Sequence, residues 1–198
     1  MKHFWDERYA KNEYAYGKEP NQFLKENLQF IPRGKILFVA EGEGRNAIFA
    51  AQNGFEVSAF DYSESGQKKA LRLASENNVE ISYVVSDVLE LSYNENSFDA
   101  IVLIFAHFPS GFRKEAHLKL LTYLKPNGTI LFEAFSKEQL NYASGGPKDS
   151  SMLFSGEEVK SEFEGVKFDF LKTEIALFNE GPHHQGEGSV IRFVGTKL

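Results

Sequence analysis

The chain has 198 residues, which favours one domain over two, and its 22 basic and 28 acidic side chains give a net charge of −6 without any Lys- and Arg-rich block that would suit nucleic acid. The absence of cysteine excludes disulfides, zinc–thiolate sites and a cysteine nucleophile. The charged N-terminus does not resemble a signal peptide, and the longest apolar run, residues 100–106, is far shorter than the ~20 residues of a membrane span, so we expect a cytoplasmic protein with no membrane partner.

From residue 35 onward, short β-branched or aromatic runs alternate with helical patterns, as in stacked βαβ units. The predicted strands are 35–40, 56–60, 81–85, 100–105 and 129–135, and the predicted helices are 45–53, 63–76 and 112–124. Two later runs, 166–178 and 189–195, predict a terminal antiparallel pair. We therefore predict an α/β Rossmann-like three-layer sandwich with a mostly parallel seven-stranded sheet and an antiparallel C-terminal strand. It forms one domain over residues 1–198, with a helical lid (1–33) on the core (34–198).

Polar residues mark several element boundaries in the second half of the chain. Ser136 with Gln139, and Ser155 with Glu158, have the spacing of a capping box, in which two side chains satisfy the first backbone N–H groups of a helix. The KPNG run at 125–128 predicts a turn before the strand at 129–135.

The turn after the first strand contains two glycines that let the backbone pass close to a ligand at a helix N-terminus. It reads EGEGRN over residues 41–46, with glycines at Gly42 and Gly44. In an open α/β sheet, ligands bind outside the carboxyl ends of the strands, where this turn lies. A glycine here can also serve only to turn the chain.

Carboxylates follow the next two strands and surround the glycine turn. Asp61 follows the glycine turn at close to the ~20-residue spacing at which a carboxylate accepts both hydroxyls of a ribose. Asp87 has the matching place after the third strand. Either aspartate could instead cap the element that follows it. Glu41 and Glu43 would repel a pyrophosphate and attract a cationic ligand.

With these features the sequence resembles the class I S-adenosylmethionine-dependent methyltransferases, in particular the small bacterial tellurite-resistance or thiopurine methyltransferase-like group. The resemblance covers nearly the whole chain. It is carried by these runs: FWDERY (4–9), YGKEPN (16–21), AEGEGRNA (40–47), FDAIVLIFAHFP (98–109), LKPNGTILFEAF (124–135) and EGPHHQG (180–186).

The resemblance implies S-adenosylmethionine as cofactor and assigns a place to each part of it. Its implied binding residues are Glu41, Gly42 and Gly44 for the methionine end, Asp61 for the ribose, Asp87 and Val88 for the adenine, and Phe105 and Ala106 beside the transferred methyl group, with the adjoining Asn46, Tyr62 and Ser63. The chain departs from the family at Phe38 and Ala40, where an acidic residue and a glycine are common. Glu41 would then have to hold the amino group.

Three side chains are candidates for the catalytic side. His107, directly after the fourth strand, could act as a general base, or it could simply pack against its loop. The family motif around residues 180–186 selects His184 over its neighbour His183 as a residue on the substrate side, and because adjacent rings in extended chain point oppositely, we expect no metal there. Tyr16 belongs to an aromatic N-terminal cluster that would exclude water and meet a sulfonium through cation–π contact.

We therefore expect methyl transfer to a small molecule, a thiol, a metalloid or another heteroatom nucleophile, with S-adenosylhomocysteine as product. We expect a monomer or weak homodimer. One alternative is an NAD-dependent oxidoreductase, because the turn also fits a GxGxxA fingerprint that ends at Ala47. The other is a noncatalytic domain that binds an adenosyl ligand, because no obligatory catalytic motif is present.

Overall fold

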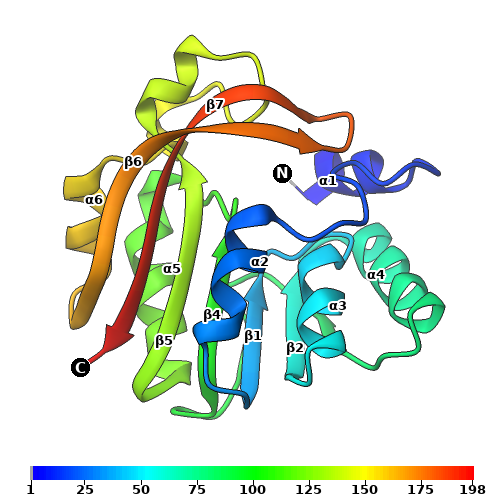
Figure 1. Ribbon diagram of the computed structural model, residues 1–198, viewed down its shortest axis with the longest axis horizontal. Helices are drawn as coiled ribbons and strands as arrows, with labels where there is room; N and C mark the ends of the chain where they lie inside the picture. Colours follow the sequence, from blue (N-terminus) through cyan, green and yellow to red (C-terminus); the bar gives the residue numbers. More distant parts are fainter. Residues whose placement is uncertain (1) are drawn as a thin grey trace.

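The computed structural model describes residues 2–198, and its centre is one seven-stranded sheet in the order β3-β2-β1-β4-β5-β7-β6 (Figure 1). Strand β7 runs antiparallel to both of its neighbours, whereas the ladders from β3 through β5 are parallel. The strand bounds are β1 Lys35–Val39, β2 Glu56–Asp61, β3 Ser82–Val85, β4 Phe98–Ile104, β5 Leu124–Phe135, β6 Val166–Glu180 and β7 His184–Lys197. The predicted α/β architecture is confirmed.

Helices cover both faces of this sheet. They are α1 Lys2–Tyr9, α2 Gln22–Asn27, α3 Arg45–Gln52, α4 Glu64–Glu76, α5 Ser110–Tyr123 and α6 Gly156–Glu162. In Figure 1, α2 and α3 lie in front of the strands and α5 lies behind them. Short 3₁₀ turns occur at Leu28–Phe30, Lys137–Asn141 and Ser150–Met152.

Strand β1 shows why the central strands read as continuous apolar runs. Ile36 and Phe38 pack with residues of α2, α3 and α4, whereas Leu37 and Val39 pack with residues of α5 and α6. All four side chains are almost fully buried. Successive side chains of a strand point to opposite faces, so a strand between two helical layers needs apolar residues at every position.

Two boundaries differ from the sequence-based expectation. The β6–β7 pair extends from Val166 to Lys197, because Gly186 and the polar residues around it join the ladder through their backbones although they lack a strand-like pattern. Strand β5 begins at Leu124, so the predicted turn at 125–128 lies inside it, as an irregular stretch with Asn127 at φ 62°.

The two predicted capping boxes have different outcomes. Ser155 and Glu158 form the box at the start of α6. The box at Ser136 is wrong: its hydroxyl donates to the hydroxyl of Ser189 in β7, 2.7 Å away, and Gln139 bonds Ser144 instead. The Ser136 hydroxyl thus bonds a buried partner on a neighbouring strand and does not cap the local backbone.

Figure 1 shows α1 and the tip of the β6–β7 hairpin above the carboxyl ends of the central strands. Residues 2–33, predicted as a helical lid, contain α1, α2 and a connecting segment. No helix in residues 2–198 is long and apolar enough to cross a membrane.

Candidate functional site

The turn after β1 is built from left-handed residues. Ala40, Gly42 and Gly44 have φ values of 51°, 62° and 90°. A Cβ at Gly44 would lie 2.7 Å from Cβ of Ala70, so this glycine lets α3 approach α4. A Cβ at Gly42 would lie 2.6 Å from the hydroxyl of Tyr9, so here the missing side chain makes room for α1.

Glu41 caps helix α3. Its Oε1 accepts hydrogen bonds from the backbone N–H groups of Asn46 and Ala47 at 2.9 and 2.8 Å, where the helix dipole favours a negative charge. Burial nevertheless raises the pKa of Glu41 to about 7. The predicted site residue Asn46 is itself buried, and its Oδ1 accepts the backbone N–H of Asn21 at 2.9 Å.

Glu43 has a different environment. Its Oε1 lies 2.6 Å from Nζ of Lys69, and its Oε2 accepts the backbone N–H of Ala15 at 2.7 Å. The charge is therefore already paired with a buried lysine. The idea that Glu43 attracts a cationic ligand is not supported by this geometry, and Glu41 is the acid of the turn without a lysine or arginine partner in direct contact.

Asp61 stands at the carboxyl end of β2 and is only 4% exposed. Its two oxygens accept the backbone N–H groups of Gly42 (3.1 Å) and Ser63 (2.9 Å), which ties the glycine turn to the start of α4. Burial raises the pKa of Asp61 to about 6. A carboxylate has about four lone-pair positions, so two remain for a ligand's hydroxyl groups.

Helix α1 lies against the same strand ends. The hydroxyl of Ser63 caps α4 by accepting the N–H of Gly66, and it donates to Oδ1 of Asp6 at 2.7 Å. Tyr62, next to it, is partly buried. Ser63 and Tyr62 therefore meet α1 at the place where the resemblance puts the cofactor.

Asp87 and Val88 follow β3. Asp87 is exposed, and its Oδ1 accepts the N–H of Leu89 at 2.9 Å, which is the local capping contact given above as the alternative. Val88 is buried in the core. An adenine contact by these two residues stays a prediction.

Phe105 and Ala106 follow β4 on the other side of β1. Phe105 has φ 56°, a left-handed value that costs an L-residue about 1 kcal/mol or more, and its N–H donates to the carbonyl of Glu133 at 2.7 Å. Its ring packs against those of Phe135 and His184, with centroids 4.7 Å away in both cases. Ala106 is buried in the core.

His107 has no ring nitrogen free to accept a proton. Its Nδ1 lies 2.8 Å from the carbonyl oxygen of Met152 and so donates, and its Nε2 accepts the N–H of Phe135 at 3.3 Å. The protein packed around the ring lowers its pKa to about 4. The general-base role is therefore corrected: His107 pins the loop after β4, which is the packing alternative.

His184 is placed differently. The ring is 4% exposed, and Nδ1 lies 3.4 Å from Oε2 of Glu180. Tyr16 packs against it with ring centroids 4.5 Å apart, and the hydroxyl of Tyr16 accepts a hydrogen bond from Arg8 at 3.0 Å. The structure thus brings Tyr16, Phe105 and His184 together and leaves His107 in a separate role.

Sequence reasoning missed a buried polar network beside this cluster. Glu180 bonds Arg45 at 2.8 Å and the side-chain amide of Asn21 at 3.1 Å, and the same amide reaches Glu133 at 2.9 Å. Glu133 also pairs with Arg192. Asn21, Arg45 and Glu180 fall in the motifs YGKEPN, AEGEGRNA and EGPHHQG. The motifs therefore pointed to these residues, but they did not show that the three side chains bond one another.

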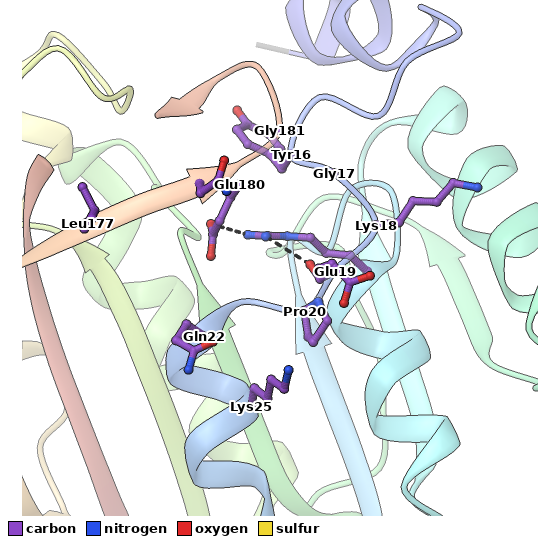
Figure 2. A pocket seen from close by; sticks show the side chains of 12 residues that line it. Tyr16, Gly17, Lys18, Glu19, Pro20, Gln22, Lys25, Leu177, Glu180 and Gly181 are labelled. Carbon is purple, nitrogen blue, oxygen red and sulfur yellow. Dashed lines mark hydrogen bonds and ion pairs between the residues drawn. The ribbon is translucent and has the colours of Figure 1, made fainter. Parts of the chain in front are cut away.

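A pocket of about 490 Å³ opens next to the network. Figure 2 shows Glu180 reaching from β6 toward the segment that carries Gly17, Glu19 and Pro20, with Lys18 and Lys25 at the rim. Among residues 2–198, no group of three or more His, Asp or Glu side chains could hold a metal ion.

Known proteins are similar to this chain in sequence. A family described as a methyltransferase domain matches residues 36–128. The chain is 32% identical over 111 residues to a ubiquinone biosynthesis O-methyltransferase of Rickettsia akari, and 28% over 106 residues to a demethylmenaquinone methyltransferase of Renibacterium salmoninarum. The matches cover 56% and 54% of this chain, and only 44% and 43% of those proteins.

Solved structures share the fold at low identity. TehB from Haemophilus influenzae has a TM-score of 0.74 at 16% identity, over 100% of this chain and 67% of its own. A methyltransferase from Methanosarcina mazei has a TM-score of 0.72 at 15% identity, and the match covers 91% of this chain and 99% of that protein. A structure reported for conversion of a disulfide bond into a thioacetal group during echinomycin biosynthesis has a TM-score of 0.81 at 16% identity. That match covers 100% of this chain and 91% of that protein. The class I fold is confirmed, while TehB is one neighbour among several, so the narrower subgroup is not singled out.

Proposed function

We propose that the chain transfers the methyl group of S-adenosylmethionine to a small molecule and leaves S-adenosylhomocysteine, as its match to a methyltransferase domain over residues 36–128 and its fold suggest. The observation that carries the proposal is the buried Asp61 carboxylate, locked to the glycine turn and still able to accept two further hydrogen bonds. In the proposed complex this carboxylate would bind the ribose diol, and Glu41 of the neighbouring turn would face the cationic end of the ligand.

The residues present fit that cofactor. Glu41, at the N-terminus of α3, would hold its ammonium group, and Asp61 its ribose hydroxyls. When bound, S-adenosylmethionine supplies a methyl group on a positively charged sulfur. Glu41 also argues against NAD, because its carboxylate at this helix N-terminus would face the pyrophosphate.

The acceptor would lie on the side of Tyr16, Phe105 and His184. The rings exclude water from the reacting atoms, which strengthens electrostatic interactions there, and aromatic faces attract a sulfonium. We infer an acceptor with a sulfur, oxygen or metalloid nucleophile. The similarity to an O-methyltransferase of ubiquinone biosynthesis supports an oxygen acceptor.

Calorimetric titration tests the ligand class. Wild-type protein should bind S-adenosylmethionine and S-adenosylhomocysteine in a 1:1 ratio and give no heat with NAD. Asp61→Asn should weaken both adenosyl ligands by about 2 kcal/mol, roughly 30-fold, because ribose hydroxyls lose a charged acceptor. Asp99→Asn, at the amino end of β4, is the matched control and should leave both affinities unchanged. NAD binding, or an unchanged affinity in folded Asp61→Asn, would contradict the proposal.

A further inference from the structure

His184 has one ring nitrogen facing a carboxylate and the other available. Nδ1 lies 3.4 Å from Oε2 of Glu180, a long hydrogen bond of the kind that tightens when a site fills. Nε2 makes no hydrogen bond within residues 2–198, and it is not among the fully enclosed polar atoms that lack a partner. A carboxylate at Nδ1 favours the tautomer with the proton on Nδ1, which leaves the Nε2 lone pair free.

The carboxylate of Glu180 is itself held from two sides. Arg45 at the start of α3 donates to Oε2 at 2.8 Å, and the amide of Asn21 donates to Oε1 at 3.1 Å. Burial opposes its charge, but His184 and Arg45 outweigh burial and lower the pKa of Glu180 to about 2. Glu180 is thus a fixed anion, and it cannot rotate away from the imidazole without breaking the network.

The ring is also fixed by packing, in part against residues that the proposed function puts on the transfer side. Phe105 and Tyr16 contact it, and a Cβ at Gly145 would come within 2.8 Å of its Cδ2. Phe105 belongs to the carboxyl end of β4, next to the strand that carries the glycine turn. The titratable or charged groups around the ring are Glu180, Arg45, Tyr16, His183 and His107.

The other imidazoles of the interior lack this arrangement. His107 has both nitrogens bonded to backbone groups. His117 is fully buried between α5 and α6, with Nδ1 2.9 Å from Glu162 and the ring stacked on Phe163. Among these three buried or half-buried histidines, His184 alone combines an orienting carboxylate with a nitrogen that reaches solvent.

We propose that His184 is the general base of the transfer reaction and that Glu180 is its positioning residue. This inference rests on the proposed function and narrows its acceptor class to molecules whose reacting atom carries a removable proton, namely a thiol or a hydroxyl. Anionic metalloid acceptors, which need no base, fall outside it.

The proposed step balances as follows. The lone pair of the acceptor atom forms a bond to the methyl carbon, the carbon–sulfur bond breaks, and its electron pair stays on sulfur, which becomes neutral. The acceptor's proton passes to Nε2 of His184, and the imidazolium that forms is stabilised by Glu180 through Nδ1–H. The proton then leaves to solvent, which restores the neutral ring.

Nitrogen NMR of ¹⁵N-histidine-labelled full-length protein tests the arrangement without any acceptor. At pH 7, His184 should be neutral, with the proton on Nδ1 and none on Nε2. In Glu180→Ala the ring loses the carboxylate acceptor at Nδ1, so the preference for Nδ1–H should disappear and the proton should shift toward Nε2. A wild-type ring protonated on Nε2, or a tautomer unchanged by Glu180→Ala, would overturn the proposal.

Methylation assays with two thiols separate a base from a structural residue. His184→Gln should slow transfer to 2-mercaptoethanol, which is protonated at pH 7, by about 100-fold or more, and transfer to 5-thio-2-nitrobenzoate, which is already ionised, by less than about 5-fold. His183→Gln is the matched control, since its ring is more exposed and has no carboxylate partner, and it should change neither rate more than about 2-fold.

Each outcome has a distinct meaning. Equal loss with both thiols would overturn the base role. If wild-type protein methylates neither thiol, the NMR tautomer decides. A protein that binds no S-adenosylmethionine in calorimetry but keeps the Nδ1–H tautomer would refute the proposed function and leave the His184–Glu180 arrangement in place. Thermal unfolding of each variant verifies that it folds.

Discussion

Two residues at the ends of the central strands have left-handed backbones although they are not glycine. Ala40 follows β1 with φ 51°, and Phe105 follows β4 with φ 56°. Hydrogen bonds hold the strained segments, from Glu41 N–H to Phe60 O and from Phe105 N–H to Glu133 O. Strained residues persist where surrounding contacts over-determine them, and they concentrate at functional sites. Here they flank the place where β1 and β4 diverge, which is the switch point of such sheets.

Glu41 gives the first stability prediction. Its folded-state pKa of about 7 lies above the ordinary 4.5, so the folded chain holds the proton more tightly, and stability is lost as pH rises from about 4.5 to 7. Glu41→Gln keeps an oxygen for the N–H groups of Asn46 and Ala47 and removes the buried charge. Its free energy of unfolding should match wild type at pH 4.5 and exceed it by about 1–3 kcal/mol at pH 8.

Urea unfolding at both pH values measures the difference. Glu90→Gln, an exposed control, should show no pH-dependent gain over wild type. A variant less stable than wild type at pH 8 would mean that the negative charge at the α3 N-terminus stabilises the helix by more than burial costs. Adding S-adenosylmethionine should reduce the difference, because its ammonium group would favour the ionised form of Glu41.

Among the helices and strands, short-range sequence patterns correctly predicted the boundaries that are set by contacts between residues close in sequence. Helix α4 begins after Ser63 because the Ser63 hydroxyl accepts the Gly66 N–H, and α6 begins after Ser155 for the same reason. Ser136 has similar spacing, yet its hydroxyl bonds Ser189, 53 residues away. A tertiary partner does not by itself prevent a cap, because the Ser63 hydroxyl donates to Asp6 while it accepts the Gly66 N–H. A cap forms only where the fold keeps the hydroxyl oxygen beside the helix N–H groups, which the sequence spacing alone does not tell.

In the candidate site, too, the features set by short-range pattern could be predicted from the sequence, and those set by contacts between distant segments could not. The glycine turn and Asp61 could be predicted, because strand ends and turn residues follow from short-range pattern. The fate of His107 could not, because it depends on the carbonyl of Met152 and the N–H of Phe135, which the fold brings from two other segments. Asn21 and Arg45 were missed for the same reason, since their partners are 112–159 and 135 residues away.

The cap of α6 allows a prediction at this scale. Ser155→Ala removes the hydroxyl that accepts the Glu158 N–H and breaks the capping box, so the free energy of unfolding should fall by about 1 kcal/mol. Affinity for S-adenosylmethionine should not change, because α6 packs on α5 away from the glycine turn. Ser161→Ala in the same helix is the control and should cost less than half as much. An equal loss in both variants would refute the cap as its cause.

At the scale of the whole molecule, buried ion pairs connect the β6–β7 hairpin to β5 and to α3. Arg192 of β7 pairs with Glu133 of β5, and Arg45 of α3 pairs with Glu180 of β6. Asn21 bridges the two pairs, with 1% of its surface exposed. The N-terminal segment is thereby tied to α3 and to the β6–β7 hairpin at once. Loss of this bridge is costly, because each buried carboxylate keeps its arginine but has one oxygen left without its amide donor.

Asn21→Ala therefore tests whether the halves of the site are coupled through this bridge. The change removes the amide donors to Glu133 and Glu180 and the side-chain oxygen that caps α2 at the Leu24 N–H. We expect the free energy of unfolding to fall by about 3 kcal/mol in urea titrations. Asn53→Ala, an exposed asparagine bonded only to Phe49 O, should cost less than about 0.5 kcal/mol. Hydrogen exchange of Asn21→Ala should rise in the hairpin and in residues 16–30 together. A rise confined to α2 would show that Asn21 acts as a helix cap alone, and that the hairpin keeps its shape without the Asn21 bridge.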